Sequence, residues 1–337
     1  MAKIILGLDI GGANLKAATS EGRALSVPFA VWKQPEKLGD AIRDLVAKFP
    51  EADEIAATMT AELCDCFDTK REGVKAIVDC LAAVSKNVRI WSTDGEFVSA
   101  NFAKEYHLKV AAANWHALAT FVGQTIGGNC ILLDIGTTTT DIIPIVNGLV
   151  SAKGRTDYER INHHELVYMG WRRTPLMTTP FHSPQAAELF ATTLDAYLVL
   201  EKIAPDPEDR DTADGRPATV PHAMARMARM ACADLDEYPP EKVLKYAETV
   251  FHQQCAVIQM SLSAVQDSTK SKFKNGYYLV TSGSGEFLAR EVVTFKSEML
   301  SLLKHVACIS LSERIGPELS GAAPSYAVAV LAAERPR

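Results

Sequence analysis

The chain has 337 residues, 47% of them hydrophobic and 23% charged, which is long enough for about two domains with a large core. Its 35 Lys and Arg against 41 Asp and Glu give a net charge of -6, so no basic excess is present for a nucleic-acid backbone. No apolar stretch approaches the roughly 20 residues that span a bilayer, and seven scattered cysteines fit reduced thiols better than a disulfide framework. We therefore expect a cytoplasmic protein that acts on small molecules and binds neither nucleic acid nor membrane.

The first predicted elements form an antiparallel meander. Residues 4–12 are an apolar run that ends in Asp9, Gly11 and Gly12, a pattern typical of a buried strand that enters a tight turn. The chain then reverses, because residues 15–19 and 25–32 are predicted as further strands.

The same design recurs in the middle of the chain. Residues 130–136 are again an apolar strand that ends in Asp-Ile-Gly, and residues 140–146 follow as a strand with an Asn-Gly hairpin signal after it. Asp9 and Asp134 lie 134 minus 9, or 125, residues apart. This offset is far longer than a solenoid repeat and indicates a duplicated domain.

Helix and strand signals alternate elsewhere, as an α/β fold requires. Predicted helices cover residues 38–49, 74–84, 115–126, 184–200, 220–233, 240–265 and 322–333. Predicted strands cover residues 55–59, 88–91 and 277–281, and an exposed connection covers 204–221. We therefore predict an α/β protein of two lobes with a central cleft: a first lobe at 1–126, a second at 127–321 with a helical insertion, and a C-terminal helix at 322–337 that returns to the first lobe.

The duplicated turns have the chemistry of a phosphate site. A strand that ends in Asp and passes into glycines directs several backbone N–H groups to one point, and such a nest binds phosphate oxygens. The adjacent carboxylates, Asp9 and Asp134, are suited to holding Mg2+ through water. Seven residues further on, Lys16 can meet phosphate in the first copy, and Asp141 can meet the metal in the second.

A third glycine turn follows the strand at 277–281. Gly283, Ser284 and Gly285 precede a helical pattern, and a helix N-terminus there would attract an anion. The alternative is an ordinary strand-to-helix connection, which would be preferred if this turn stood alone.

Taken together, these motifs resemble the actin-like ATPase and sugar-kinase superfamily, whose fold has two ribonuclease H-like lobes. The resemblance rests on Asp-Ile-Gly-Gly-Ala-Asn at 9–14, Asp-Ile-Gly-Thr-Thr-Thr-Thr-Asp at 134–141 and Ser-Gly-Ser-Gly-Glu at 282–286. Within it, Thr-Met-Thr-Ala-Glu-Leu at 58–63 and Gly-Arg-Thr-Asp at 154–157 are similar to a hydantoinase/oxoprolinase-related group linked to tetrahydromethanopterin-dependent one-carbon transfer.

The resemblance implies a synthase rather than a kinase. In that group, a methanofuran-pathway member joins the phenol oxygen of γ-glutamyltyramine to an aminomethylfuran-methyl diphosphate and releases diphosphate. By implication the partners of this chain are an organic diphosphate and a phenol, derived from tyramine or tyrosine. The stretch that contains Trp171, Arg172 and Arg173 departs from the family pattern.

We assign site residues on this basis. Phosphate contacts are assigned to Gly11, Gly12, Asn14, Lys16, Gly136, Thr137, Thr138, Thr139, Gly283, Ser284 and Gly285, and metal contacts to Asp9, Asp134 and Asp141. The cationic run of Arg155, Arg160, Arg172 and Arg173 can clamp diphosphate or form structural ion pairs, and we assign its first two members to phosphate. For the base that accepts the phenol proton, Glu62 is the first candidate, and Asp65 and Asp157 are the second.

Two rival hypotheses use the same turns. In the first, they bind ATP in a small-metabolite kinase or a hydantoinase-like enzyme. In the second, they bind a nucleotide in a regulator without turnover, against which the ionisable groups of the polar motifs argue. Dependence on ATP with formation of ADP would favour the first rival over the synthase.

Overall fold

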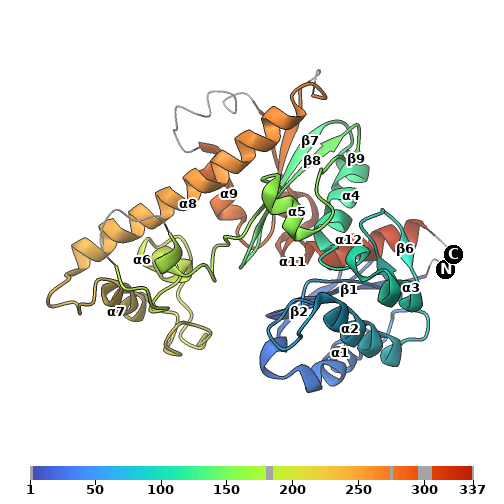
Figure 1. Cartoon of the computed structure of the whole chain (residues 1–337), viewed down its shortest axis with the longest axis horizontal. Coiled ribbons are helices and arrows are strands. Elements are labelled where there is room, and N and C mark those ends of the chain that lie inside the picture. Colours follow the sequence, from blue (N-terminus) through green and yellow to red (C-terminus); the bar gives the residue numbers. More distant parts are fainter. Residues whose placement is uncertain (1–2, 180–184, 274–275, 295–305, 336–337) are drawn as a thin grey trace.

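The computed structural model describes residues 3–179, 185–273, 276–294 and 306–335, and it is built on two six-stranded β-sheets (Figure 1). The first sheet has the strand order β3-β2-β1-β4-β5-β6. Its strands are β1 (Ile5–Ile10), β2 (Asn14–Thr19), β3 (Ala24–Pro28), β4 (Glu54–Met59), β5 (Arg89–Trp91) and β6 (Phe97–Val98). The first three are antiparallel, as the meander predicts, and β4 and β5 add in parallel.

The second sheet repeats this plan, with the order β10-β8-β7-β11-β12 and β9 paired to β8. Its strands are β7 (Cys130–Ile135), β8 (Thr140–Val146), β9 (Leu149–Val150), β10 (Leu166–Val167), β11 (Tyr278–Ser282) and β12 (Cys308–Ser310). The antiparallel pair β7-β8 and the parallel strands β11 and β12 correspond to β1-β2, β4 and β5. The hairpin predicted after β8 is confirmed, since Asn147 and Gly148 both have positive φ, as a type I′ turn requires.

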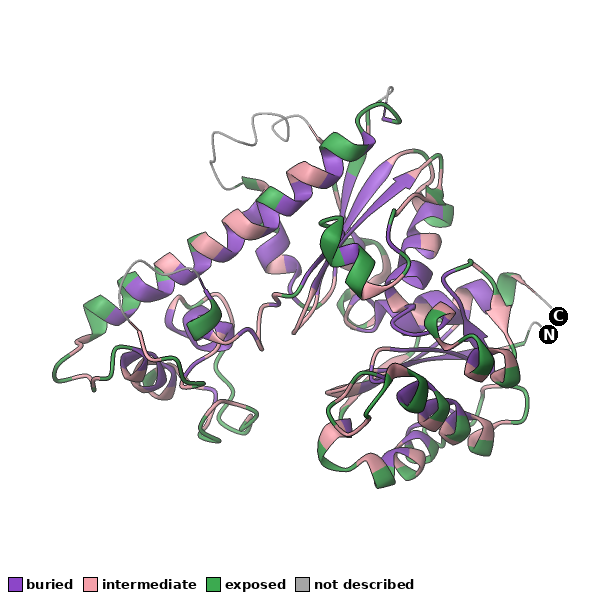
Figure 2. Ribbon diagram, viewed as in Figure 1, coloured by how far each residue is buried: buried purple, intermediate pink, exposed green. Residues whose placement is uncertain are grey.

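Helices cover both sheets, and one helical layer lies between them. The first sheet is covered by α1 (Leu38–Val46), α2 (Lys70–Val84) and α3 (Ala100–Glu105), and the second by α8 (Pro240–Thr269) and α9 (Glu286–Thr294). A shared core joins strands of both sheets to α4 (Asn114–Ile126) and α12 (Ala323–Glu334). In Figure 2 the central strands β1, β4, β7 and β8 are almost wholly buried, as strands covered on both faces must be, whereas the edge strand β3 is partly exposed.

Helix α12 lies directly on the first sheet. A Cβ atom added to Gly7 of β1 would stand 1.8 Å from the carbonyl oxygen of Ser325, so only glycine permits this approach. The helix predicted to return to the first lobe therefore packs there, and residues 336–337 of that predicted segment lie outside the described ranges. The lobe boundaries themselves stay predictions.

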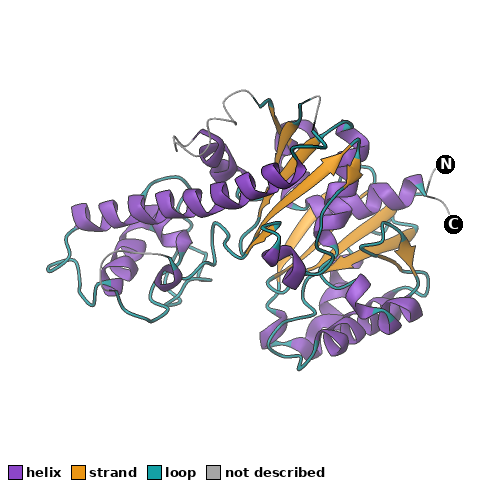
Figure 3. Ribbon diagram, turned by 45° about the horizontal axis from the view of Figure 1, so that its top comes forward, coloured by secondary structure: helices purple, strands orange, loops and turns teal. Residues whose placement is uncertain are grey.

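The chain between β10 and β11 contains a helical insertion, drawn to the left in Figures 1 and 3. Its helices are η4 (Leu176–Thr178), α6 (Thr193–Val199), α7 (Val220–Met230) and the long α8, whereas the short helix α5 (Asp157–Asn162) precedes β10. Its core includes a fully buried Arg226 that pairs with Asp195 at 2.7 Å and Asp214 at 3.0 Å. The exposed connection predicted at 204–221 therefore contributes Asp214, which forms an ion pair with the buried Arg226.

Several predicted elements differ in extent by three residues or more, and two differences affect the insertion and the site. The helical pattern at 184–200 gives a helix only over Thr193–Val199, because Thr192 and Asp195 form a capping box that starts it there; residue 184 is outside the described ranges. The strand predicted at 25–32 ends at Pro28. Beyond it, the N–H groups of Phe29 and Val31 bond to Ala13 and Gly12 in the first glycine turn, and a 3-10 helix follows at Val31–Lys33.

The remaining short helices are η2 (Pro35–Lys37), η3 (His107–Lys109), α10 (Leu311–Ile315) and α11 (Pro317–Gly321). Across the described residues, no helix combines the length and apolarity that a membrane crossing needs.

Candidate active site

The two glycine turns have the same internal geometry. In the first, the N–H of Gly11 donates to the carbonyl oxygen of Asn14 at 3.1 Å. In the second, Gly136 donates to Thr139 at 2.9 Å, and both of these residues lie 125 positions further along. The strand register places Asp9 opposite Lys16 and Asp134 opposite Asp141. The duplication inferred from the sequence is thus present in the strand register and in the hydrogen bond that closes each turn.

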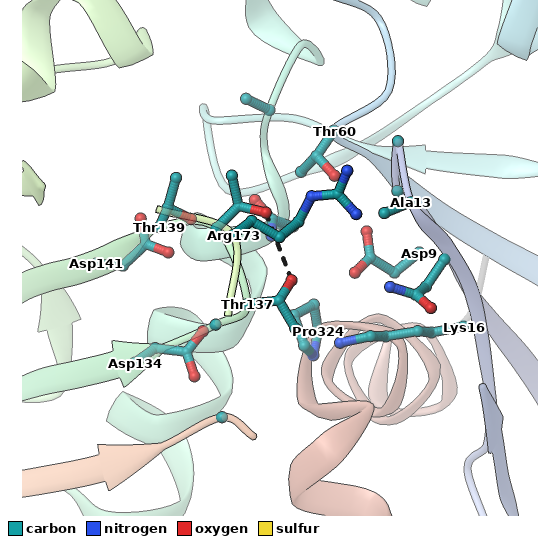
Figure 4. A pocket seen from close by; sticks show the side chains of 18 of the residues that line it. Asp9, Ala13, Lys16, Thr60, Asp134, Thr137, Thr139, Asp141, Arg173 and Pro324 are labelled. Atoms are coloured by element: carbon teal, nitrogen blue, oxygen red, sulfur yellow. Dashed lines mark hydrogen bonds between the residues drawn. The ribbon is translucent and has the colours of Figure 1, made fainter. Parts of the chain in front are cut away.

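Both turns open into one cavity of about 550 Å³. Figure 4 shows Asp9 and Lys16 on one side and Asp134 and Asp141 on the other, with Arg173 between them. The predicted site residues that line this cavity are Asp9, Gly11, Gly12, Asn14, Lys16, Glu62, Asp65, Asp134, Gly136, Thr137, Thr138, Thr139, Asp141, Asp157, Arg160, Gly283 and Ser284. Turns that are distant in sequence therefore meet in one place.

Two predicted phosphate ligands are not among the lining residues. The Arg155 side chain is more than half exposed, donates to the Thr93 carbonyl and lies 3.6 Å from Asp94. The N–H of Gly285 donates to the carbonyl oxygen of Ile135 in β7 at 2.8 Å, so this N–H group is not available to a phosphate. The structure thus places both residues in contacts that hold the fold.

Asp9 and Asp134 are carboxylates at the ends of β1 and β7; Asp9 is buried, and Asp134 is half-buried with its Oδ1 atom shielded from solvent. Each has an Oδ1 atom without a hydrogen-bond partner. Burial raises the pKa of Asp134 to about 7, and the neighbouring Asp141 adds to the rise. Burial also raises the pKa of Asp9, against the opposing charge of Lys16. Buried carboxylates of this kind require a cation or a proton.

Asp141 already has such a cation. The Arg160 side chain is only 1% exposed, forms an ion pair with Asp141, lies 3.3 Å from Asp157 and has its guanidinium carbon 4.2 Å from the Trp115 ring centre. The charge of Arg160 is therefore shared by two carboxylates. Both predicted roles, phosphate binding by Arg160 and metal binding by Asp141, compete with this buried pair.

Glu62 lies in the loop after β4 and is 1% exposed. Helix α2 fixes it, since a Cβ atom on Gly73 would lie 2.1 Å from the Glu62 carbonyl oxygen. Burial raises the pKa of Glu62 to about 7, against the effect of backbone N–H groups at Glu62 and Ala112 and of the Lys70 charge. Its Oε2 has no hydrogen-bond partner. A buried carboxylate with a free oxygen and a pKa near neutrality is well suited to accept a proton.

The second candidates for the base are placed differently. Asp65 lies at the exposed rim of the cavity. Asp157 is the first residue of α5 and pairs with Arg160, and burial raises its pKa while Arg160 opposes the rise. The geometry therefore favours Glu62 among the three.

The third turn closes the cavity beside β7. Ser284 accepts a hydrogen bond at 2.9 Å from the indole N–H of Trp171. The first residue of α9, Glu286, accepts one at 2.8 Å from Thr281, so a carboxylate already occupies the helix N-terminus. Anion binding at this turn is consequently limited to Gly283 and Ser284, which line the cavity.

No three His, Cys, Asp or Glu side chains within the described ranges form a preassembled metal cage. The unpartnered oxygens of Asp9 and Asp134 nevertheless fit Mg2+, which usually takes one or two carboxylates and keeps several waters.

Several lining residues were not assigned from the sequence. Trp32, Leu63 and Tyr168 add an apolar and aromatic wall, and Leu63 and Tyr168 are 60% and 68% exposed. Arg173, left open in the sequence, lines the cavity, and its backbone N–H donates to Thr137 at 2.9 Å. No local pattern marks these residues, because the cavity brings them together from separate segments.

Comparison with known proteins gives two relatives that share a name. The chain is 34% identical, over 98% of both chains, to (4-{4-[2-(gamma-L-glutamylamino)ethyl]phenoxymethyl}furan-2-yl)methanamine synthase of Methanocaldococcus jannaschii. It is 36% identical to the enzyme of the same name from Methanococcus vannielii, over 63% of this chain and 95% of that one.

The fold is also found among solved structures. Nucleotide-free acetone carboxylase superposes with a TM-score of 0.58 at 11% identity, over 98% of this chain and 70% of that one. The predicted α/β class with two actin-like lobes is confirmed. The family model described as hydantoinase/oxoprolinase matches residues 53–316. With most of its length matched, the chain belongs to the hydantoinase/oxoprolinase family.

Proposed function

We propose that this protein is a transferase that builds the aryl-ether core of methanofuran or of a related cofactor. The phenol oxygen of γ-glutamyltyramine, or of a tyrosine-derived acceptor, displaces diphosphate from an aminomethylfuran-methyl diphosphate. The relatives support this reaction, because the product in their name contains a phenoxymethyl group on a furan ring.

One structural observation carries the proposal. Glu62, whose Oε2 has no hydrogen-bond partner, lines the same cavity as the two glycine turns. A phenol has a pKa of about 10, so its attack at neutral pH benefits from a nearby base. The turns offer backbone N–H groups to the leaving diphosphate. Acceptor activation and leaving-group stabilisation are thus available in one cavity.

We propose Mg2+ as the cofactor, held through Asp9 and Asp134. Six acidic residues line the cavity against three basic ones, Lys16, Arg160 and Arg173. An organic diphosphate would enter this surplus of negative charge at a large electrostatic cost without a divalent cation. When bound, Mg2+ would neutralise charge on the diphosphate oxygens.

The phenol oxygen forms a bond to the methyl carbon of the furan, and the bond from that carbon to the diphosphate oxygen breaks. Glu62 accepts the phenol proton, and diphosphate leaves with the electron pair of the broken bond. Lys16 and the two turns bind the departing anion; the N–H groups of Gly12 and Thr137 are available for this, since those of Gly11 and Gly136 donate within their own turns.

We place this reaction in the cytoplasm. All seven cysteines are free thiols, which supports a reducing compartment, and both proposed substrates are small molecules.

The test is turnover by the purified protein with the furan-methyl diphosphate, γ-glutamyltyramine and Mg2+, without ATP. We expect one diphosphate released for each ether formed, by coupled phosphate assay and mass spectrometry. Strict dependence on ATP with ADP formed would instead favour the kinase or hydantoinase-like alternative, and nucleotide binding without turnover would favour the regulator.

A further inference from the structure

We propose that Arg173, held against Trp32 on the opposite side of the cleft, is the clamp that binds the diphosphate group of the substrate. This inference rests on the proposed function, which makes the substrate an organic diphosphate. It gives a role to a residue that neither the family pattern nor the duplicated turns assign.

The pair connects the two glycine turns. The backbone N–H of Arg173 donates to the carbonyl oxygen of Thr137 in the second turn at 2.9 Å. On the other side, Val31 donates to Gly12 of the first turn at 2.9 Å, and Trp32 follows directly. The Arg173 guanidinium carbon lies 4.9 Å from the Trp32 ring centre. Figure 4 shows its side chain reaching from Thr137 toward Ala13 and Thr60.

Arg173 has its charge available for a ligand. Of the three basic residues that line the cavity, Arg160 is committed to Asp141 and Asp157. The Arg173 side chain is 29% exposed. Within the described residues it forms an ion pair with Asp211, whose side chain is 63% exposed, at a nitrogen–oxygen distance of 3.2 Å. An exposed pair of this kind contributes little and is readily exchanged for a better anion. A diphosphate between the turns is such an anion.

The position selects the diphosphate over a carboxylate of the acceptor. The Arg173 backbone is hydrogen-bonded to the turn that would hold phosphate, so its guanidinium stays within one side-chain length of that turn. A planar guanidinium can bind two phosphate oxygens at once, and stacking on Trp32 fixes its plane. Trp32 lies where it would orient the clamp before the ligand arrives.

The neighbouring Arg172 provides a matched control. Its backbone N–H also bonds to Thr137, at 3.2 Å, and its side chain pairs with Asp209 at 2.8 Å. It does not line the cavity. The two arginines therefore share backbone environment, charge and an acidic neighbour, Asp211, and differ in access to the ligand.

The experiment is calorimetric titration of the full-length protein with magnesium diphosphate. We expect Arg173→Ala to weaken binding on the order of 10- to 100-fold, the effect of losing a charge-assisted contact, and Arg173→Lys to weaken it less. Trp32→Leu should weaken it roughly threefold. Arg172→Ala and Asp211→Asn should retain wild-type affinity, with thermal melts to verify folding. Equal affinity of Arg173→Ala and wild type would overturn the inference, as would equal losses in both arginine variants.

Steady-state kinetics distinguish binding of the diphosphate from binding of the acceptor carboxylate, and they test the clamp separately from the proposed reaction. The inference predicts that Arg173→Ala raises KM for the furan-methyl diphosphate and leaves KM for γ-glutamyltyramine unchanged. A rise only for γ-glutamyltyramine, absent with tyramine, would move Arg173 to the acceptor carboxylate and refute the clamp. If no ether forms in wild type but Arg173→Ala still loses diphosphate affinity, the clamp stands and the proposed reaction fails.

Discussion

Replacing Glu62 with glutamine tests both the burial and the role of this residue. Burial raises the pKa of Glu62 from an ordinary 4.5 to about 7, so the folded protein retains a proton that the unfolded chain releases between these values. Stability therefore falls as pH rises through this window, and the loss is complete above pH 7. At 1.36 kcal/mol for each pKa unit, the rise from 4.5 to about 7 lowers the free energy of unfolding by about 3 kcal/mol above this window.

Glu62→Gln removes this penalty, because the amide stays neutral. We expect the variant to match wild type near pH 4.5 and to exceed it in unfolding free energy by up to about 3 kcal/mol at pH 8. The assay is urea denaturation of both proteins at the two pH values without Mg2+. Since Asp134 titrates equally in both, the difference between the proteins isolates Glu62.

Activity gives the second readout for the same variant. Loss of a general base should lower kcat by about 10²- to 10⁴-fold with folding intact. Wild-type kcat/KM should rise with pH through about 7, as Glu62 ionises. Full activity of Glu62→Gln would remove the base assignment, and equal stability of the two proteins at pH 8 would refute the burial argument.

Three further predictions concern the surroundings of Glu62 and the metal. Gly73→Ala places a Cβ atom 2.1 Å from the Glu62 carbonyl oxygen and should lower both the melting temperature and kcat. The control is Gly39→Ala, whose added Cβ atom would lie 3.6 Å from its nearest neighbour, the Cys80 sulfur, and should change neither quantity. Thermal melts and steady-state assays compare the two variants. Mg2+ affinity should be about tenfold weaker at pH 6 than at pH 8, because the raised pKa of Asp134 makes binding compete with a proton. In calorimetry, Asp134→Asn should bind Mg2+ more weakly at pH 8 and show a smaller difference between the two pH values; an unchanged difference would contradict the assignment. Arg160→Met leaves two carboxylates without their buried partner and should cost about 3 to 5 kcal/mol in denaturant titrations; an unchanged midpoint would contradict the ion-pair geometry.

The features that could be predicted from the sequence are those encoded locally. An apolar run that ends in Asp and glycine specifies a strand and a turn by itself, so Asp9 and Asp134 could be placed, and their offset predicted the duplication. Element bounds such as those of β8 and α4 followed from the same patterns within one or two residues.

What could not be predicted depends on long-range contacts. The spacing of Arg160 and Asp141 in sequence gives no sign that they form a buried pair beneath Trp115. Trp32 and Arg173 meet only because separate segments bond to the two glycine turns. Arg155 is the opposite case: its sequence motif led us to assign it to phosphate, but its side chain donates a hydrogen bond to the Thr93 carbonyl instead.

The position of bond cleavage tests the central claim most directly. The acceptor would carry ¹⁸O at its phenol oxygen, and the products of a reaction with the furan-methyl diphosphate would be analysed by mass spectrometry. Attack at carbon predicts that all of the label is found in the ether and none in the released diphosphate. An aryl phosphate that carries the label, or ether formation only with ATP, would contradict the account.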